Sequence, residues 1–138
     1  MIGVLIIAHG DLGDGLLHSA AHVMGKMPEQ FACMAVSAQD DPLAVEQRGR
    51  TLLEQLDSGD GVLIFTDIFG ATPSNVAGRL IMPGRVAAIA GVSLPMLVRA
   101  LTYRSQSLRV VMDKAVSGGH EGIVLMEHDY VAARSANH

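Results

Sequence analysis

His9 is a titratable residue at the point where an apolar segment gives way to a glycine-rich turn. It follows residues 2–8, all apolar or glycine, and precedes the run Gly10-Asp11-Leu12-Gly13-Asp14-Gly15. In open α/β sheets, ligands and reactive groups gather at the carboxyl ends of strands, because the loops there present side chains above a rigid sheet. This position favours a chemical role for His9. The simpler interpretation is a histidine that caps a strand and bonds to nearby backbone.

Asp67 stands in an equivalent place, directly after the apolar residues 62–66. The first and third strands of doubly wound sheets often lie side by side, so we expect the two loops to meet over the carboxyl edge. A carboxylate that accepts a hydrogen bond from imidazole Nδ1–H fixes the tautomer, leaves Nε2 as the nucleophile and stabilises positive charge on the ring. The alternative is that Asp67 bonds only to amides of its own loop.

The turn Gly70-Ala71-Thr72-Pro73 adds a third element to this pair. With Thr72 as N-cap and Pro73 as the first helical residue, the turn would offer amide groups and the positive end of a helix dipole to an anion near His9. Such a terminus binds phosphate well. In the alternative interpretation Thr72 only caps the helix.

Other chemical motifs are missing from the sequence. It has no Gly-x-Gly-x-x-Gly spacing, no Gly-Lys-Ser/Thr ending and no Gly-x-Ser-x-Gly elbow, so neither a nucleotide cradle nor an acyl-transfer nucleophile is indicated. His18 and His22 have a spacing compatible with a metal, but no third ligand is obvious, and we interpret them as surface residues. We expect no metal and no cofactor.

The composition indicates one domain with an aliphatic core. The chain has 138 residues, 49% of them hydrophobic and only 4% aromatic, which suits buried strands covered by helices. The net charge is −4 and the basic residues are scattered, so a nucleic-acid partner is not indicated. Cys33 is the single cysteine and is expected to be a small buried hydrophobe. The apolar start is too short for a signal peptide or a membrane span, which predicts a soluble cytoplasmic protein without direct membrane insertion.

Apolar runs alternate with segments of helical spacing, which is typical of βαβ units. We predict strands at residues 2–8, 31–36, 62–66 and 86–90, and helices at 14–26, from 42 onward, from 72 to about 82, from 94 to about 103 and at 105–116. The predicted fold class is α/β: a doubly wound, mainly parallel four-stranded sheet with helices on both faces. Residues 123–126 predict a short fifth edge strand, antiparallel or exchanged with another subunit. The domain is expected at 1–126, with a flexible tail at 127–138.

Three segments together resemble one family. They are Ile6-Ile7-Ala8-His9-Gly10, the run from Thr66 to Asn75, and Ala90-Gly91-Val92-Ser93-Leu94-Pro95-Met96-Leu97. In order and spacing they resemble the mannose-family IIA domain of the bacterial phosphoenolpyruvate:sugar phosphotransferase system, over residues 1–126. Phe69 stands where the family commonly has tryptophan, and the turn after it replaces Gly-Gly-Ser-Pro. These exchanges retain an aromatic ring at Phe69, a turn at Gly70-Ala71 and a hydroxyl group at Thr72.

The resemblance implies that His9 accepts a phosphoryl group on Nε2 from the phosphocarrier protein HPr and passes it to a IIB protein. It further implies that Asp67 orients the ring and that Gly70, Ala71 and Thr72 bind the phosphoryl group. Family members are homodimers in which the terminal strand packs against the partner subunit. No IIB domain follows in this sequence, so we expect a free-standing IIA protein whose acceptor is a IIB protein on a separate chain.

Two other functions stay open at this point. One is the phosphocarrier subunit of a dihydroxyacetone kinase, which shares the fold and the N-terminal histidine, although the turn at Thr72-Pro73-Ser74-Asn75 fits the mannose type better. The other is a small-molecule-binding regulatory domain that never carries phosphate. Sugar specificity in such systems lies with the IIB and membrane subunits, so the output is either transport or regulation.

Overall fold

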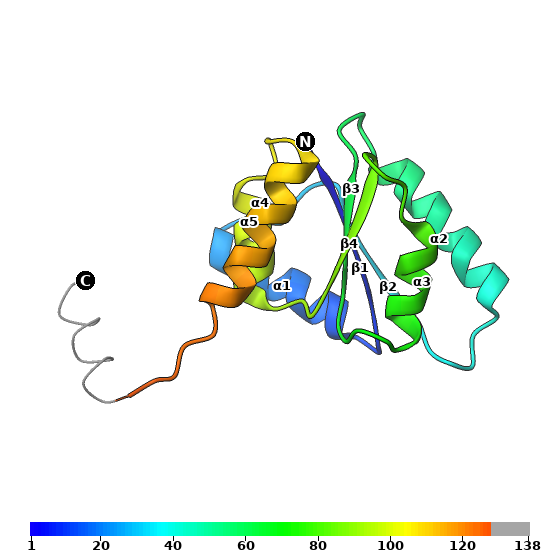
Figure 1. Cartoon of the computed structure of the whole chain (residues 1–138), viewed down its shortest axis with the longest axis horizontal. Helices are drawn as coiled ribbons and strands as arrows, with labels where there is room; N and C mark the ends of the chain where they lie inside the picture. The colour runs from blue at the N-terminus through cyan, green and yellow to red at the C-terminus, as the bar shows by residue number, and fades with distance from the viewer. Residues whose placement is uncertain (128–138) are drawn as a thin grey trace.

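The computed structural model describes residues 1–127, and Figure 1 shows the arrangement of their elements. The strands are β1 (Gly3–Ala8), β2 (Phe31–Ala35), β3 (Val62–Thr66) and β4 (Val86–Ala90). The helices are α1 (Leu12–Met24), α2 (Pro42–Leu56), α3 (Thr72–Leu80), α4 (Leu94–Thr102) and α5 (Leu108–Glu121). The predicted tail at 127–138 lies, except for its first residue, outside the described residues.

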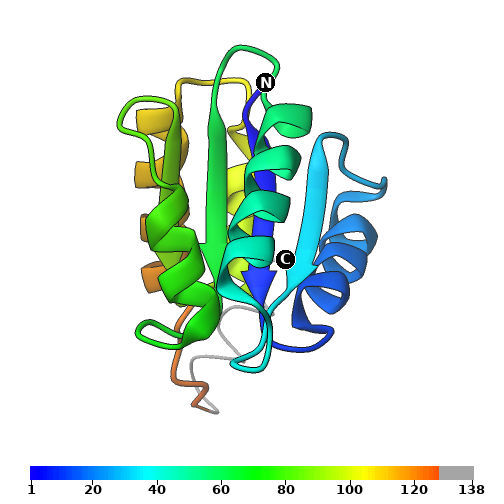
Figure 2. The same ribbon diagram turned by 90° about the vertical axis from the view of Figure 1, so that its right-hand side faces the viewer.

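The strands form one parallel sheet in the order β2-β1-β3-β4. Helices α1, α4 and α5 cover one face and α2 and α3 cover the other, as Figures 1 and 2 show from two directions. Because every connection is a helical crossover, all strands point the same way and their carboxyl ends share one edge. The predicted doubly wound α/β fold with a four-stranded parallel sheet is confirmed.

β1 lies inside the sheet and is buried along its whole length. Its side chains alternate between two separate cores: Val4 and Ile6 pack with the helices α1, α4 and α5, while Leu5 and Ile7 pack with α2 and α3. A strand covered on both faces reads as a continuous apolar run, which is why the sequence predicted it well. This burial fixes the backbone up to the residue before His9.

Cys33 lies on β2, where it is half-buried against the helix α1. Burial of the thiol, with a smaller contribution from the nearby Asp14 carboxylate, raises the pKa of Cys33 to about 12. The thiol therefore stays protonated and unreactive at neutral pH, as expected of a packing residue.

The predicted fifth strand at residues 123–126 is not formed. The segment is irregular, and the side chains of Ile123, Leu125 and Met126 are 85%, 80% and 74% exposed. In Figure 1 it leaves α5 and runs away from the sheet. Within residues 1–127 the segment has no neighbouring strand, and an extended chain without a partner for its amides and carbonyls does not form a ladder. The prediction was wrong for the single chain.

The helix α5 extends beyond its predicted end at residue 116. It continues through Gly118 and Gly119 to Glu121. A Cβ on Gly118 would come within 2.9 Å of the Arg99 side chain, and one on Gly119 within 2.6 Å of Met96. These glycines let α5 pack closely on α4 and do not end the helix. Their role depends on the neighbouring helix, which local sequence does not show.

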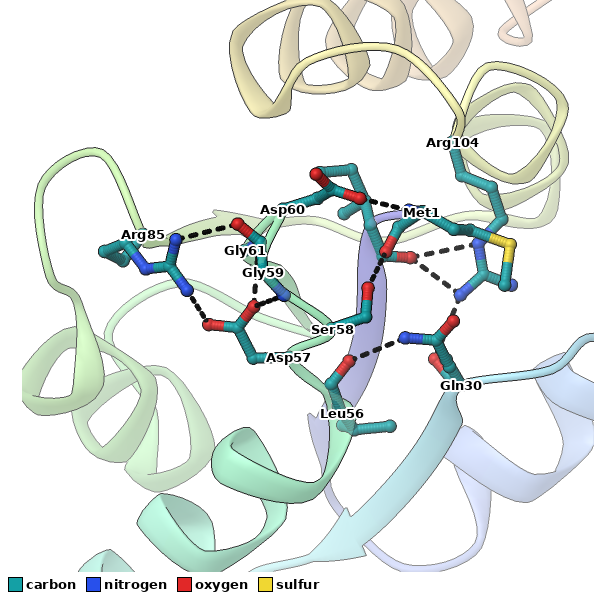
Figure 3. A network of polar contacts seen from close by, with 11 residues as sticks. Met1, Gln30, Leu56, Asp57, Ser58, Gly59, Asp60, Gly61, Arg85 and Arg104 are labelled. Atoms are coloured by element: carbon teal, nitrogen blue, oxygen red, sulfur yellow. Dashed lines mark hydrogen bonds and ion pairs between the residues drawn. The ribbon is translucent and has the colours of Figure 1, made fainter.

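A buried arginine joins three connections at the amino-terminal edge of the sheet (Figure 3). The guanidinium of Arg104 donates to the Ile2 carbonyl through Nε at 3.0 Å and Nη2 at 2.7 Å, to the Glu29 carbonyl through Nη1 at 2.6 Å, and to the Gln30 carbonyl through Nη2 at 3.0 Å. Burial lowers the pKa of Arg104, and the residue is only 7% exposed. It ties the α4–α5 connection to the starts of β1 and β2.

A second polar cluster holds the turn before β3 (Figure 3). The Asp57 carboxylate accepts hydrogen bonds from the amides of Gly59 and Gly61 and pairs with Arg85. Burial of the carboxylate opposes ionisation, but these bonds outweigh it and hold the pKa of Asp57 below its ordinary value. Both clusters lie at the edge of the sheet opposite to His9.

Arg104→Met should lower the free energy of unfolding by about 2–4 kcal/mol, because three main-chain carbonyls, one of them fully buried, lose a charged donor. Urea unfolding of the purified protein measures this change. The matched control Arg109→Met removes a cation that is exposed on α5, and it should change stability by less than about 0.5 kcal/mol. Equal stability of the two variants would show that the Arg104 bonds are not structural.

Candidate functional site

His9 begins the loop that follows β1. The chain turns at Gly10, whose φ of 54° lies in the left-handed region, and the Leu12 amide donates to the His9 carbonyl at 3.3 Å as the helix α1 starts. The His9 side chain is 51% exposed. The buried strand thus delivers the ring to the surface from a rigid base.

Asp67 follows β3 and makes direct contact with His9. One carboxylate oxygen, Oδ2, lies 2.7 Å from His9 Nδ1 and also accepts a hydrogen bond from the His9 amide at 2.9 Å. The other oxygen, Oδ1, accepts from the Ile68 amide at 2.9 Å. The structure therefore brings His9 and Asp67 together, as the sequence predicted. The alternative, that Asp67 bonds to an amide of its own loop, also describes Oδ1, which accepts from Ile68.

The charge of Asp67 is set by these bonds. The carboxylate is 13% exposed, and its burial favours the neutral acid. Hydrogen bonds from the His9 amide and ring, then from the Ile68 amide, outweigh burial and hold the pKa of Asp67 below its ordinary value. An ionised carboxylate only accepts hydrogen bonds, so the neutral His9 ring carries its hydrogen on Nδ1 and its lone pair on Nε2.

The turn after Asp67 leads into α3, whose first helical residue is Thr72 and not Pro73. Ala71, in extended conformation, is the N-cap residue without a side-chain cap bond, and its carbonyl accepts the Asn75 amide at 3.0 Å. The prediction of Thr72 as N-cap was wrong, because Thr72 is already helical and its hydroxyl does not cap. Ser74 Oγ instead accepts from the Gly70 amide at 3.4 Å.

The predicted anion-binding residues Gly70, Ala71 and Thr72 lie at the same edge of the sheet as His9. Gly70 has a φ of 89°, so a residue with a side chain would be strained there. The positive end of the α3 dipole points to this edge. The N-terminus of α3 and the His9 ring therefore share one edge of the sheet.

The loop after β4 supports Asp67 from the side away from His9. The Gly91 amide donates to the Asp67 carbonyl at 3.1 Å, and the Val92 amide donates to the Thr66 carbonyl at 3.0 Å. Sequence reasoning missed this support, although a glycine directly after a strand, here with φ of 84°, was the available signal. Met96, in the first turn of α4, is 5% exposed and packs in the core.

His18 and His22 are exposed on α1. Among residues 1–127, no three His, Cys, Asp or Glu side chains come together as metal ligands. In the same part of the chain, every helix is too short or too polar to cross a bilayer.

Comparison with known proteins finds relatives that are named as components of the phosphotransferase system (PTS). The chain is 30% identical over 125 residues to the PTS system mannose-specific EIIAB component of Escherichia coli (strain K12), covering 88% of this chain and 38% of that protein. It is 30% identical over 105 residues to the PTS system fructose-specific EIIA component of Bacillus subtilis (strain 168), covering 75% of this chain and 71% of that one. The chain thus spans less than half the length of the mannose-specific relative.

Among solved structures, the chain resembles the phosphotransferase system component EIIA from Streptococcus agalactiae, with a TM-score of 0.79 and 28% identity over 91% of this chain and 97% of that one. The family model EIIA-man, described as the PTS system fructose IIA component, matches residues 3–116. This match covers the sheet, the His9–Asp67 pair and most of the helices, and the chain therefore belongs to the EIIA-man family of the phosphotransferase system.

Proposed function

We propose that this protein is a phosphoryl carrier of the phosphotransferase system, in which His9 accepts a phosphoryl group from one protein and transfers it to another. The observation that carries the proposal is the His9 ring, half exposed and bonded through Nδ1 to the Asp67 carboxylate. A nucleophile needs access to its partner, and an oriented ring reduces the entropy that must be lost before reaction.

In the proposed first transfer, the Nε2 lone pair of His9 attacks the phosphorus atom of a phosphohistidine on the donor. The P–N bond to the donor breaks as the new P–N bond forms, and the electron pair of the broken bond returns to the donor's ring nitrogen. His9 loses no proton, because its hydrogen stays on Nδ1. The ring becomes positively charged, and the ionised Asp67 carboxylate stabilises that charge. The second transfer reverses these steps toward the acceptor.

The turn at Gly70, Ala71 and Thr72 is proposed to bind the phosphoryl oxygens. The uncapped N-terminus of α3 supports this role, because no side chain of the N-cap residue occupies its first amides. A helix N-terminus stabilises a negative group, and the Thr72 hydroxyl, which does not cap the helix, adds a donor. Binding of this kind needs neither a metal nor a cofactor.

We propose HPr as the donor and a IIB protein as the acceptor, in the cytoplasm. The name of the Escherichia coli relative combines A and B components, which supports an acceptor of the B type. Ile68 and Phe69, which are 60% and 85% exposed directly after Asp67, give the site an apolar border that suits contact with protein partners. We assign this role to a domain of residues 1–126.

His9→Ala should abolish phosphorylation. The measurement incubates the protein with phosphoenolpyruvate, enzyme I and HPr, and detects one acid-labile phosphoryl group by intact mass spectrometry. The control His18→Ala removes an exposed histidine of α1 and should be labelled like the wild type. Labelling of the His9 variant would refute the assignment. An unlabelled wild type that still binds a small molecule would favour the regulatory alternative.

We further propose a homodimer in which residues 123–126 of one subunit pair with β4 of the other. β4 is the last strand of the sheet, and within the described residues its outer edge is bonded only at Val86, which bridges to Met82. A groove of about 570 Å³ beside it is lined by Ala87, Ala88 and Met112, among others. An open strand edge is a template for pairing, and the exposed apolar side chains of residues 123–126 suit this groove.

The wild type should sediment as a dimer at micromolar concentration, and Leu125→Asp should sediment as a monomer, because the charge would enter the proposed interface. Leu43→Asp changes an equally exposed leucine on α2 and should leave the dimer intact. Analytical ultracentrifugation distinguishes the species. A monomeric wild type, or a dimer that Leu125→Asp does not weaken, would contradict the proposed pairing.

A further inference from the structure

A cavity lies at the amino-terminal edge of the sheet, at the end opposite to His9. It has a volume of about 470 Å³ and is formed by the start of the chain, the α1–β2 connection and the α4–α5 connection. Pockets of roughly 300–1,000 Å³ are the usual size for small molecules. Phosphoryl transfer at His9 leaves this cavity unused.

The walls of the cavity are mainly apolar. Met1, Met24, Met27 and Leu101 line it, together with a proline. Methionine side chains are unbranched and polarisable, so they adapt their shape to an apolar ligand. Figure 3 shows the side chain of Met1 beside the guanidinium of Arg104.

The charge in the cavity wall is positive. Lys26 and Arg104 line it with Glu29 as the acidic residue, so two positive charges face one negative charge. Within residues 1–127, the Arg104 guanidinium makes no ion pair within 4.0 Å and its bonds go to main-chain carbonyls, while the Glu29 carboxylate acts on it from a greater distance. A buried cation without a directly bonded counter-ion favours an anion nearby, because little solvent screens it.

Arg104 also keeps one donor for a ligand. A guanidinium has five N–H groups. Four hydrogen bonds are made by Arg104, and only one of them comes from Nη1, which has two N–H groups. One Nη1–H is therefore not used by these bonds, on a side chain that lines the cavity.

We propose that this cavity binds a small molecule that carries a carboxylate on a short apolar chain. The carboxylate lies toward Arg104 and Lys26, and the apolar chain lies among Met24, Met27 and Leu101. The two parts of the ligand match the two features of the wall, a positive charge without a full counter-charge and a flexible apolar surface. The proposal is independent of phosphoryl transfer at His9.

Octanoate is the probe, titrated into the ¹⁵N-labelled full-length protein while amide resonances are followed by NMR. We expect saturable shifts at Met24, Met27 and Leu101. Octylamine and octan-1-ol have the same chain with a positive or neutral head, and each should bind at least about tenfold more weakly, a difference of about 1.4 kcal/mol. Shifts that do not saturate at millimolar octanoate, or equal binding of octylamine, would overturn the proposal.

Lys26→Glu provides the variant, because Lys26 is exposed and its replacement should not affect folding. The substitution reverses one charge of the cavity wall and should weaken octanoate binding at least about tenfold. The matched control Arg48→Glu makes the same charge change at an exposed position of α2 outside the cavity and should bind octanoate like the wild type. Equal affinities of the two variants would show that the charge of the cavity does not recognise the carboxylate.

Discussion

The bond between the His9 ring and the Asp67 carboxylate depends on how the two central strands are aligned. His9 and Asp67 are 58 positions apart in the chain and meet because β1 and β3 are neighbours in the sheet. Their register pairs Ile7 with Thr66, so Asp67 follows opposite Ala8 and His9 comes one residue later at the same edge. A slip of one residue would turn the side chains to the opposite faces and separate the pair. The register is in turn fixed by the alternating burial of β1 in two cores.

The two edges of the sheet have different physical roles. At the amino-terminal edge, Arg104 and Asp57 hold connections together through bonds to main-chain groups. At the carboxyl edge, the His9 ring and the side chains of Ile68 and Phe69 are exposed. Because these structural bonds lie at the amino-terminal edge, the carboxyl edge stays accessible for the contacts with protein partners that we propose. Arg104, at the amino-terminal edge, thus lies beside a cavity that takes no part in the proposed chemistry of His9.

Sequence reasoning succeeded where local pattern and burial agree. β1 and β3 are buried on both faces, so their apolar runs predicted strands, and their polar ends predicted the meeting of His9 and Asp67. It failed where tertiary contacts decide. Gly118 reads as a helix end but serves close packing against Arg99, and residues 123–126 read as a strand but have no partner within the described residues. The cap of α3 was misplaced because a threonine before proline suits both the cap and the first turn.

The central claim is that Asp67 keeps the hydrogen of His9 on Nδ1 so that phosphate is carried on Nε2. The most direct measurement is ¹⁵N NMR of the His9 ring in the phosphorylated protein, with coupling to ³¹P to identify the nitrogen that bears the phosphoryl group. We predict phosphorus coupling at Nε2 and a retained hydrogen on Nδ1. Phosphorus coupling at Nδ1 would contradict this account, since that nitrogen would then be unable to donate to Asp67.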